Sequence, residues 1–259
     1  MGKLEVVRID PHERRSSAGA GSGNLIIPAR NLLIGSLPHE AANDLTDAAR
    51  AVQLKLREVI YEGGDEIAFA YFPIDCVVSS AALLEDGSTV EIAMTGREGL
   101  VGIPALIGGG RSLHWTRVSI GGKALKISIR ALEEQAKRHE ALHRVILKSY
   151  RSLFTQICQR SVCNVRHTLL QRLCVWLLMV HDRVGRDELP LTQEEIAARI
   201  SVRRAGVSVA AAMLQSMHGI ATRRGKIVIL DRGTLETTAC ECYALLRKDF
   251  ENSGGGKQP

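Results

Sequence analysis

The chain has 259 residues, a formal net charge of +6 and only 4% aromatic residues. This length allows two domains that each bury a core of their own. The positive charge fits an anionic partner, and the scarcity of aromatic side chains argues against a protein that stacks single-stranded bases. The sequence contains neither an apolar run of membrane-spanning length nor a signal-peptide pattern. We therefore expect a cytoplasmic protein with no membrane partner, whose six cysteines are mostly reduced.

Both ends of the chain have the composition of disordered polypeptide. Residues 1–24 are polar and finish in a run of Ser, Ala and Gly, and residues 251–259 contain three consecutive glycines. Segments of this kind bury too little apolar surface to offset the entropy of ordering. The folded part of the chain is expected between them.

The first half of the chain predicts a β-roll after a short helical segment. Residues 32–50 indicate helix, with Pro38 at a helix start and Leu45 on the inner face. Short alternating runs separated by turn signals then predict strands at residues 54–61, 67–72, 77–84, 89–94, 114–120 and 124–129. Many short strands at regular spacing are typical of a sandwich or jelly roll, so we predict a roll over residues 28–129.

Residues 130–158 predict one long helix, because they contain almost no helix breakers and carry an apolar seam with spacings of three and four. A narrow seam of this length favours a second copy of the same helix. We predict a dimerisation helix over residues 130–160 in a two-fold homodimer; the alternative is a helix packed on the roll of its own chain. The seam residues expected at the contact are Leu142, Ile146, Leu153 and Ile157.

The same segment contains His139-Glu140-Ala141-Leu142-His143, an HExxH string of the kind found in zinc proteases. In one continuous helix His139 and His143 would lie one turn apart and could share a metal ion. A catalytic zinc needs a third protein ligand, however, and Ile146 and Ser149 stand where the longer signature has Gly and His. We therefore predict that the protein is not an enzyme, with a zinc hydrolase as the alternative.

The C-terminal third predicts a winged helix-turn-helix. The apolar face of residues 164–183 indicates a core helix. Thr192 and Glu195 form a capping box for a short helix, which ends at a tight break at Ser201-Val202. A second helix is expected from about Arg203 to His218, with Gly219 as its C-cap. Its buried stripe is Val207, Ala210, Met213 or Leu214, and Met217. Strands at 220–222 and 226–230 enclose a basic tip, Arg223-Arg224-Gly225-Lys226.

This stretch resembles the C-terminal domain of the Crp/Fnr family of bacterial transcription regulators. The resemblance rests on residues 191–197 (Leu-Thr-Gln-Glu-Glu-Ile-Ala), Val202, Arg204, Val207, Met213-Leu214 and the wing from Gly219-Ile220 to Gly225-Lys226-Ile227. It continues over residues 28–245 with less specific motifs. It implies an α+β protein made of a jelly-roll-like N-terminal β-roll, a long dimerisation helix and a winged helix-turn-helix at 161–250. Such a protein binds a roughly palindromic site in double-stranded DNA as a homodimer, and RNA polymerase is a further partner that the resemblance suggests.

The resemblance also assigns roles within the DNA-binding module. Arg203, Arg204 and Ser208 lie in the first turns of the second helix, where side chains face bases in the major groove, and Arg204 matches the family's base-reading arginine. Ala205 and Val209 depart from the pattern, so we expect a target other than the best-known half-site. The expected phosphate contacts are Thr192, Gln193, Arg223, Arg224 and Lys226.

Some members of this family hold a cyclic nucleotide in the roll, so the resemblance raises this ligand as a candidate effector. A phosphate site needs backbone N–H groups and an arginine, for which Gly99, Gly102, Arg111 and Ser112 are the candidates. Leu100 stands where nucleotide-binding members have a glutamate, and Arg111-Ser112 is about one residue out of the expected spacing. These departures favour a degenerate cassette that only packs the roll. The alternative function is a ligand sensor whose DNA module has lost its specificity.

The cysteines show no zinc-finger pairing of pairs, and the first of them is Cys76, whereas iron–sulfur sensors of this family group theirs near the N-terminus. Cys240-Glu241-Cys242 is a weak candidate for metal binding or thiol redox chemistry. Packing of an amphipathic helix over residues 235–246 is the alternative, so no bound metal is predicted.

Overall fold

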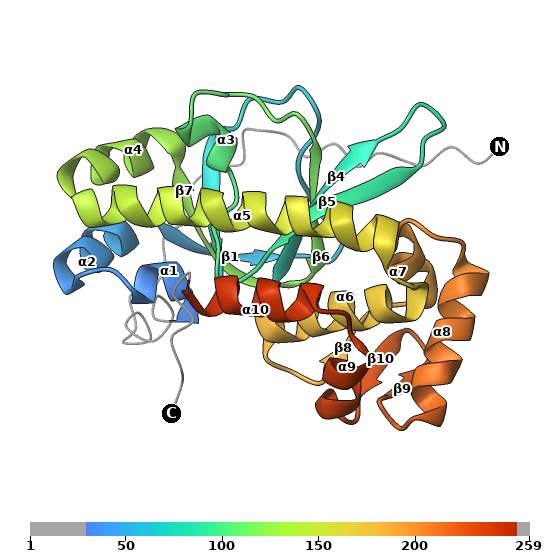
Figure 1. The fold of residues 1–259 in the computed structure, drawn as a ribbon. Coiled ribbons are helices and arrows are strands. Elements are labelled where there is room, and N and C mark those ends of the chain that lie inside the picture. The colour runs from blue at the N-terminus through green and yellow to red at the C-terminus, as the bar shows by residue number, and fades with distance from the viewer. Residues whose placement is uncertain (1–29, 253–259) are drawn as a thin grey trace.

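The computed structural model describes residues 30–252 of the chain. Within this range the chain folds into an N-terminal β-roll, a long helical segment and a C-terminal helical module with a small sheet (Figure 1). The α+β class predicted from the sequence is therefore confirmed. The predicted disordered segments 1–24 and 253–259 lie outside the described residues, while residues 251 and 252 belong to the last helix and not to a tail.

Two antiparallel sheets form the roll. One has the strand order β1-β7-β3 and the other β2-β6-β4-β5. The strands are β1 (Arg50–Leu54), β2 (Val59–Tyr61), β3 (Phe69–Pro73), β4 (Val77–Leu83), β5 (Thr89–Thr95), β6 (Trp115–Ile120) and β7 (Gly122–Ser128). The single strand predicted at residues 54–61 is wrong, because the chain passes from one sheet to the other there. Arg57 makes this change in a left-handed conformation with φ 68°.

Three short helices pack against the roll. α1 (Leu32–Gly35) and α2 (His39–Asp47) precede it, and α3 (Ile103–Leu106) lies between β5 and β6. Pro38 is the N-cap of α2 and Leu45 is completely buried, as predicted. These helices share a core with β3, β7 and the first half of the long helical segment.

The predicted unbroken helix over residues 130–158 is two helices, α4 (Ile129–Arg138) and α5 (Glu140–Arg166). His139 separates them with φ −120° and ψ 98°, outside the helical region. No Gly or Pro signals this break; the His139 Nε2 atom lies 2.9 Å from Asp44 Oδ2 of α2, so a contact distant in sequence accompanies it. The first His of the HExxH string is therefore not on the helix that carries the second.

The C-terminal module is built on α6 (Leu169–Val184), which Thr168 and Gln171 begin with a capping box. Most of α6 is buried, and its core includes Val77, Met94 and Ile120 of the roll. The remaining elements are β8 (Glu188–Leu189), α7 (Gln193–Ile200), α8 (Arg204–Ser216), β9 (Ile220–Arg223), β10 (Lys226–Ile229), α9 (Arg232–Thr238) and α10 (Cys242–Asn252). Three residues of the roll therefore belong to the core of the module, while the other buried residues of the roll form two separate clusters.

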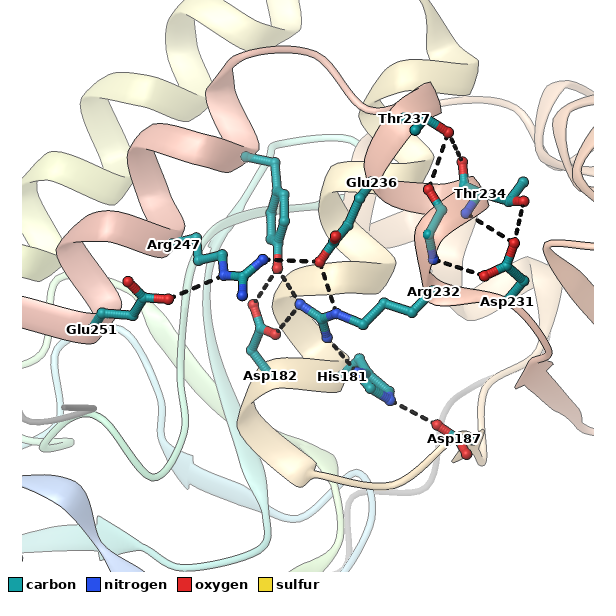
Figure 2. A network of polar contacts seen from close by, with 12 residues as sticks. His181, Asp182, Asp187, Asp231, Arg232, Thr234, Glu236, Thr237, Arg247 and Glu251 are labelled. Atoms are coloured by element: carbon teal, nitrogen blue, oxygen red, sulfur yellow. Dashed lines mark hydrogen bonds and ion pairs between the residues drawn. The ribbon is translucent and has the colours of Figure 1, made fainter. Parts of the chain in front are cut away.

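A single helix over residues 235–246 is also wrong, because the chain turns between α9 and α10, and α10 then packs against both α5 and α6. Figure 2 shows the polar network that fixes this corner. Arg232 of α9 donates to Asp182 Oδ1 at 2.7 Å and to Glu236 Oε1 at 2.8 Å, and it also bonds to the Tyr243 hydroxyl of α10. Arg247 of α10 donates to the same Glu236 oxygen at 3.0 Å.

Among the described residues, no helix combines the length and the apolar character needed to cross a membrane.

Candidate DNA-binding interface

The helix-turn-helix is set by local capping and by one left-handed residue. Thr192 and Glu195 form the predicted capping box at the start of α7: the Glu195 N–H donates to Thr192 Oγ1 at 3.2 Å, and the Thr192 N–H donates to Glu195 Oε2 at 2.8 Å. Ser201 then adopts φ 54°, which ends α7 and turns the chain toward α8. Arg203 is the N-cap of α8 and Arg204 is its first residue.

The end of α8 differs from the prediction. His218, not Gly219, takes the left-handed conformation, with φ 58°. The His218 N–H donates to Gln215 O at 3.0 Å and the Gly219 N–H to Leu214 O at 2.9 Å, the pair of bonds that defines a Schellman motif. Gly219 is required for space instead, because a Cβ there would lie 3.0 Å from Thr234 and 3.1 Å from Leu235.

The two faces of α8 have different roles. Val207, Ala210 and Leu214 are buried as predicted, so the choice between Met213 and Leu214 falls on Leu214. Met213 and Met217 are half exposed, so Met217 is not part of the stripe. The exposed face presents Arg204, Ala205 and Val209 to solvent.

A groove of about 350 Å³ lies between the N-terminus of α7, the first turn of α8 and the wing. Five of the predicted DNA-contacting residues line it: Thr192, Gln193, Arg204, Arg223 and Lys226. Arg203 and Arg224 are exposed but are not part of this lining, and Ser208 is half-buried. The fold therefore brings together residues that are 34 positions apart, from Thr192 to Lys226, on one basic surface.

Polar contacts position several of these side chains. The Ser208 hydroxyl lies 2.6 Å from Gln193 Oε1, which links α8 to α7. The Lys226 ammonium donates to Glu188 Oε1 at 2.7 Å, and this hydrogen bond holds the pKa of the Glu188 carboxyl below its usual value. Arg204 is 3.8 Å from Glu194, with both side chains well exposed. Exposed pairs of this kind are weak, so a DNA phosphate or base can compete for either cation.

A buried carboxylate that the sequence analysis missed connects this module to the roll. Glu91 of β5 accepts from Arg160 Nη1 of α5 at 2.7 Å, from Trp176 Nε1 of α6 at 2.9 Å and from Arg199 Nη1 of α7 at 3.4 Å. Burial opposes ionisation of Glu91, but Arg160 and Arg199, with hydrogen bonds from Ser79 and Trp176, outweigh it and lower its pKa. Five elements therefore meet at one charged group, since Ser79 is on β4.

The residues predicted for an effector site do not converge on one cavity. Gly102 and Ser112 line a mostly apolar pocket of about 190 Å³ in the roll, and no Arg or Lys is among the described residues around it. The exposed Arg111 is outside that lining and donates to Gly64 O at 2.7 Å. Gly99 packs against Thr95. A phosphate in this pocket would have no arginine partner, which favours the degenerate-cassette interpretation.

The four residues predicted at a helix–helix dimer contact lie in two different surroundings. Leu142 and Ile146 are buried against α1, α2 and the roll of the same chain, so their side chains are not available to a second copy. Leu153 and Ile157 line the pocket in the roll. The apolar side chains that α5 exposes are on another face: Leu147, Tyr150, Phe154, Val162 and Val165.

The described chain thus has a β-roll, a long helical segment and a winged helix-turn-helix whose groove is lined by the basic side chains Arg204, Arg223 and Lys226. Residues 171–238 match the family model of the Crp-like helix-turn-helix domain. The C-terminal region is therefore a Crp-like helix-turn-helix domain, and the resemblance found in the sequence is confirmed.

Solved structures share the fold over about three quarters of the chain. FixK2 from Bradyrhizobium japonicum superposes with a TM-score of 0.64 at 18% identity, over 74% of this chain and 98% of that chain. TTHB099, a CRP-family transcriptional regulator from Thermus thermophilus, gives 0.60 at 23% identity, over 73% and 96%. CLP, the c-di-GMP responsive global regulator of Xanthomonas campestris, gives 0.60 at 14% identity, over 75% and 100%. None of the curated proteins matches the chain. At these identities the likeness establishes the fold.

Proposed function

We propose that the protein is a sequence-specific transcription regulator that binds a roughly palindromic site in double-stranded DNA as a homodimer. The Crp-like domain supports DNA binding, and a regulator of this kind would act in the bacterial cytoplasm. One observation carries the proposal of sequence specificity. Arg204 is the exposed first residue of α8 and lines the groove that α7 and the wing complete. With α8 in a major groove, its guanidinium would face guanine O6 and N7.

The other residues of the interface are proposed to contact either bases or phosphates. Arg203 and Ser208 flank Arg204 on the base-facing side. Arg223, Arg224 and Lys226 on the wing, with Thr192 and Gln193 at the start of α7, would bind phosphates. Since Ser208 contacts the carbonyl oxygen of the Gln193 side chain, the Gln193 amide nitrogen is available as a phosphate donor.

The homodimer is proposed along a different face of α5 from the one that the sequence indicated. The exposed residues 147, 150, 154, 158, 162 and 165 follow one another at spacings of three and four, which defines one seam on the helix. We call this set the α5 seam: Leu147, Tyr150, Phe154, Cys158, Val162 and Val165. Phe154 is 57% exposed and Val165 82% exposed, a large apolar surface for a helix to leave in water.

Selection of genomic fragments by the purified protein at near-physiological salt tests the function. The wild-type chain should recover a palindrome, and Arg204→Ala should lose about 1–3 kcal/mol of preference at one base pair in each half-site. Arg130→Ala is the matched control, because Arg130 is also an exposed arginine in a surface ion pair but lies on α4, far from the groove. It should recover the same palindrome as the wild type.

The same experiment separates the alternatives. Weak, salt-sensitive retention of all fragments by wild type and variant alike would favour a ligand sensor whose module no longer reads sequence. Added cyclic AMP should leave the selected sequence and its affinity unchanged, since no arginine or lysine of the described residues lines the pocket in the roll to bind the phosphate. A nucleotide-dependent rise in affinity would contradict that expectation.

A further inference from the structure

Three cysteines and one histidine from opposite ends of the C-terminal module meet at a single point. Cys163 lies near the end of α5 and His167 is the C-cap of that helix, while Cys240 and Cys242 lie at the turn from α9 to α10. The four potential ligand atoms all lie within 4.8 Å of one another. The three cysteines are buried and the His167 side chain is only 13% exposed. Within residues 30–252 this is the only such group of three or more metal-ligating side chains.

We propose that Cys163, His167, Cys240 and Cys242 form a structural zinc site. A tetrahedral Zn²⁺ with three sulfurs and one nitrogen separates its sulfurs by about 3.8 Å and sulfur from nitrogen by about 3.6 Å. In the structure Cys163 Sγ is 3.6 Å from Cys240 Sγ, and Cys242 Sγ is 3.4 Å from His167 Nδ1. A multi-iron cluster would spread its outer ligands further apart, so the spacing favours a single ion.

The groups around the cluster support ligation. His167 Nε2 lies 3.2 Å from Glu241 Oε1, so the carboxylate can hold the imidazole with Nδ1 directed to the cysteines. Carboxylate–histidine–metal arrangements of this kind are the usual surroundings of zinc-bound histidines. The Gln159 amide also donates to Cys242 Sγ at 3.0 Å, a bond that would stabilise a thiolate.

The scaffold holds both ligand pairs in position. Cys163 and His167 are one turn apart at the end of a 27-residue helix. The turn with Cys240 and Cys242 lies between two parts of the Arg232 network, Glu236 on α9 and Tyr243 with Arg247 on α10 (Figure 2). A polar network on one side and a rigid helix on the other therefore leave the four side chains facing one another.

A closed site of four protein ligands is suited to structure and not to catalysis. On binding, each cysteine would release its thiol proton to solvent as a Zn–S bond forms, with no change of oxidation state. The ion would fasten the end of α5 to the α9–α10 turn, at the point where the long helix leads into the DNA-binding module. The inference does not depend on the proposed DNA specificity.

The test measures metal on the full-length protein, purified under reducing conditions without chelator. Elemental analysis should find one zinc per chain. After removal of the metal, cobalt(II) should restore a complex with thiolate charge-transfer bands and the strong visible absorption of tetrahedral coordination. Zinc should also raise the thermal unfolding midpoint of the metal-free protein, because metal that binds only the folded chain stabilises it.

Variants assign the ligands. Cys240→Ser should lose the stoichiometric zinc, whereas Cys76→Ser, a buried cysteine of the roll outside the cluster, should retain it. If Cys240→Ser fails to fold, Glu241→Gln provides the test instead. This variant removes only the carboxylate that contacts His167 and should lower the affinity for zinc about 10- to 100-fold. His167→Cys should keep zinc and shift the cobalt spectrum toward four thiolates.

Three results would overturn the proposal. The first is wild-type protein without zinc that also gives no cobalt–thiolate bands. The second is the same zinc content and affinity in Cys240→Ser or Glu241→Gln as in the wild type. The third is a Cys163–Cys240 disulfide found by mass spectrometry in metal-free native protein, which would assign the pair to redox chemistry instead.

Discussion

At the scale of single residues, Glu91 is a buried carboxylate that links the roll to the DNA-binding module and lies outside every motif of the sequence. Its neighbours in the chain alternate as in any strand, and its partners Arg160, Trp176 and Arg199 come from three other elements. Nothing local marks it, because its significance depends on the tertiary contacts that bury it. The proposed zinc site also depends on tertiary contacts. The sequence shows Cys240-Glu241-Cys242 as one candidate, but Cys163 and His167 come close to these cysteines only when α10 packs against α5.

Removal of the Glu91 charge should strongly destabilise the fold. Glu91→Gln would leave the mostly buried Arg160 and Arg199 without their shared counter-charge, and breaking such a pair costs about 3–5 kcal/mol. Because the folded-state pKa lies below the ordinary value of 4.5, the carboxylate contributes its full stability above that pH. The contribution is lost as the pH falls from there through the folded-state pKa.

Urea unfolding of the wild type and the variant at neutral pH and at a pH well below 4.5 checks both the size of the contribution and its loss with acid. Glu91→Gln should be less stable at neutral pH and should lose less of its remaining stability on acidification. Glu85→Gln, a substitution of an exposed glutamate in the β4–β5 turn, should match the wild type at both pH values. Equal unfolding midpoints for Glu91→Gln and Glu85→Gln would exclude the proposed role.

At the scale of elements, the sequence is most informative where local chemistry decides the structure. The capping box at Thr192, the start of α2 at Pro38 and the hairpin of the wing are confirmed because short-range hydrogen bonds and fixed dihedrals determine them. The errors at Arg57 and His139 share another cause. Each break changes the direction of the chain without a Gly or Pro, and packing against distant elements stabilises it.

The C-terminus of α8 allows a prediction that depends on the backbone conformation of one residue. His218 adopts φ 58°, a conformation that costs an ordinary side chain about 1 kcal/mol and glycine much less. His218→Gly should therefore stabilise the module by at most about 0.6 kcal/mol, because the greater entropy of glycine in the unfolded chain offsets about 0.4–1 kcal/mol of the relieved strain. Thermal unfolding of the full chain measures the shift.

The neighbouring position supplies the contrast. Gly219→Ala should destabilise the chain, since the new Cβ would crowd Thr234 and Leu235 at the start of α9. If His218→Gly lowers the unfolding midpoint as Gly219→Ala does, the left-handed strain is not the feature that limits the stability of this helix end.

At the scale of the whole molecule, apolar and charged contacts join the roll to the DNA-binding module. The apolar cluster with Val77, Met94 and Ile120, the Glu91 network and the ion pair between Arg57 of the roll and Glu195 of α7 at 2.9 Å all cross the boundary between them. The α5 seam is exposed. The sequence indicated an amphipathic helix but not which of its apolar faces stays exposed, because the roll covers Leu142 and Ile146 only once it has folded.

This arrangement predicts that one charge in the α5 seam separates the protomers without unfolding them. Phe154→Glu places a carboxylate in the centre of the seam, next to its own copy across a two-fold axis. Sedimentation should therefore show a dimer for the wild type, as proposed, and a monomer for Phe154→Glu. Leu83→Glu is the control, because Leu83 is 50% exposed at the end of β4, away from the seam, and should remain dimeric.

The DNA measurement then shows what the dimer contributes. Two linked modules bind two half-sites with an advantage of about 100-fold or more over one module. Phe154→Glu should therefore lose most of its affinity for the selected palindrome while retaining that of the wild type for an isolated half-site. A variant that remained dimeric, or a monomer that bound the palindrome as tightly as the wild type, would place the dimer contact or the source of affinity elsewhere. Arg204→Ala, in contrast, should weaken binding to both the palindrome and the isolated half-site. The two variants therefore distinguish base recognition by α8 from dimerisation through α5.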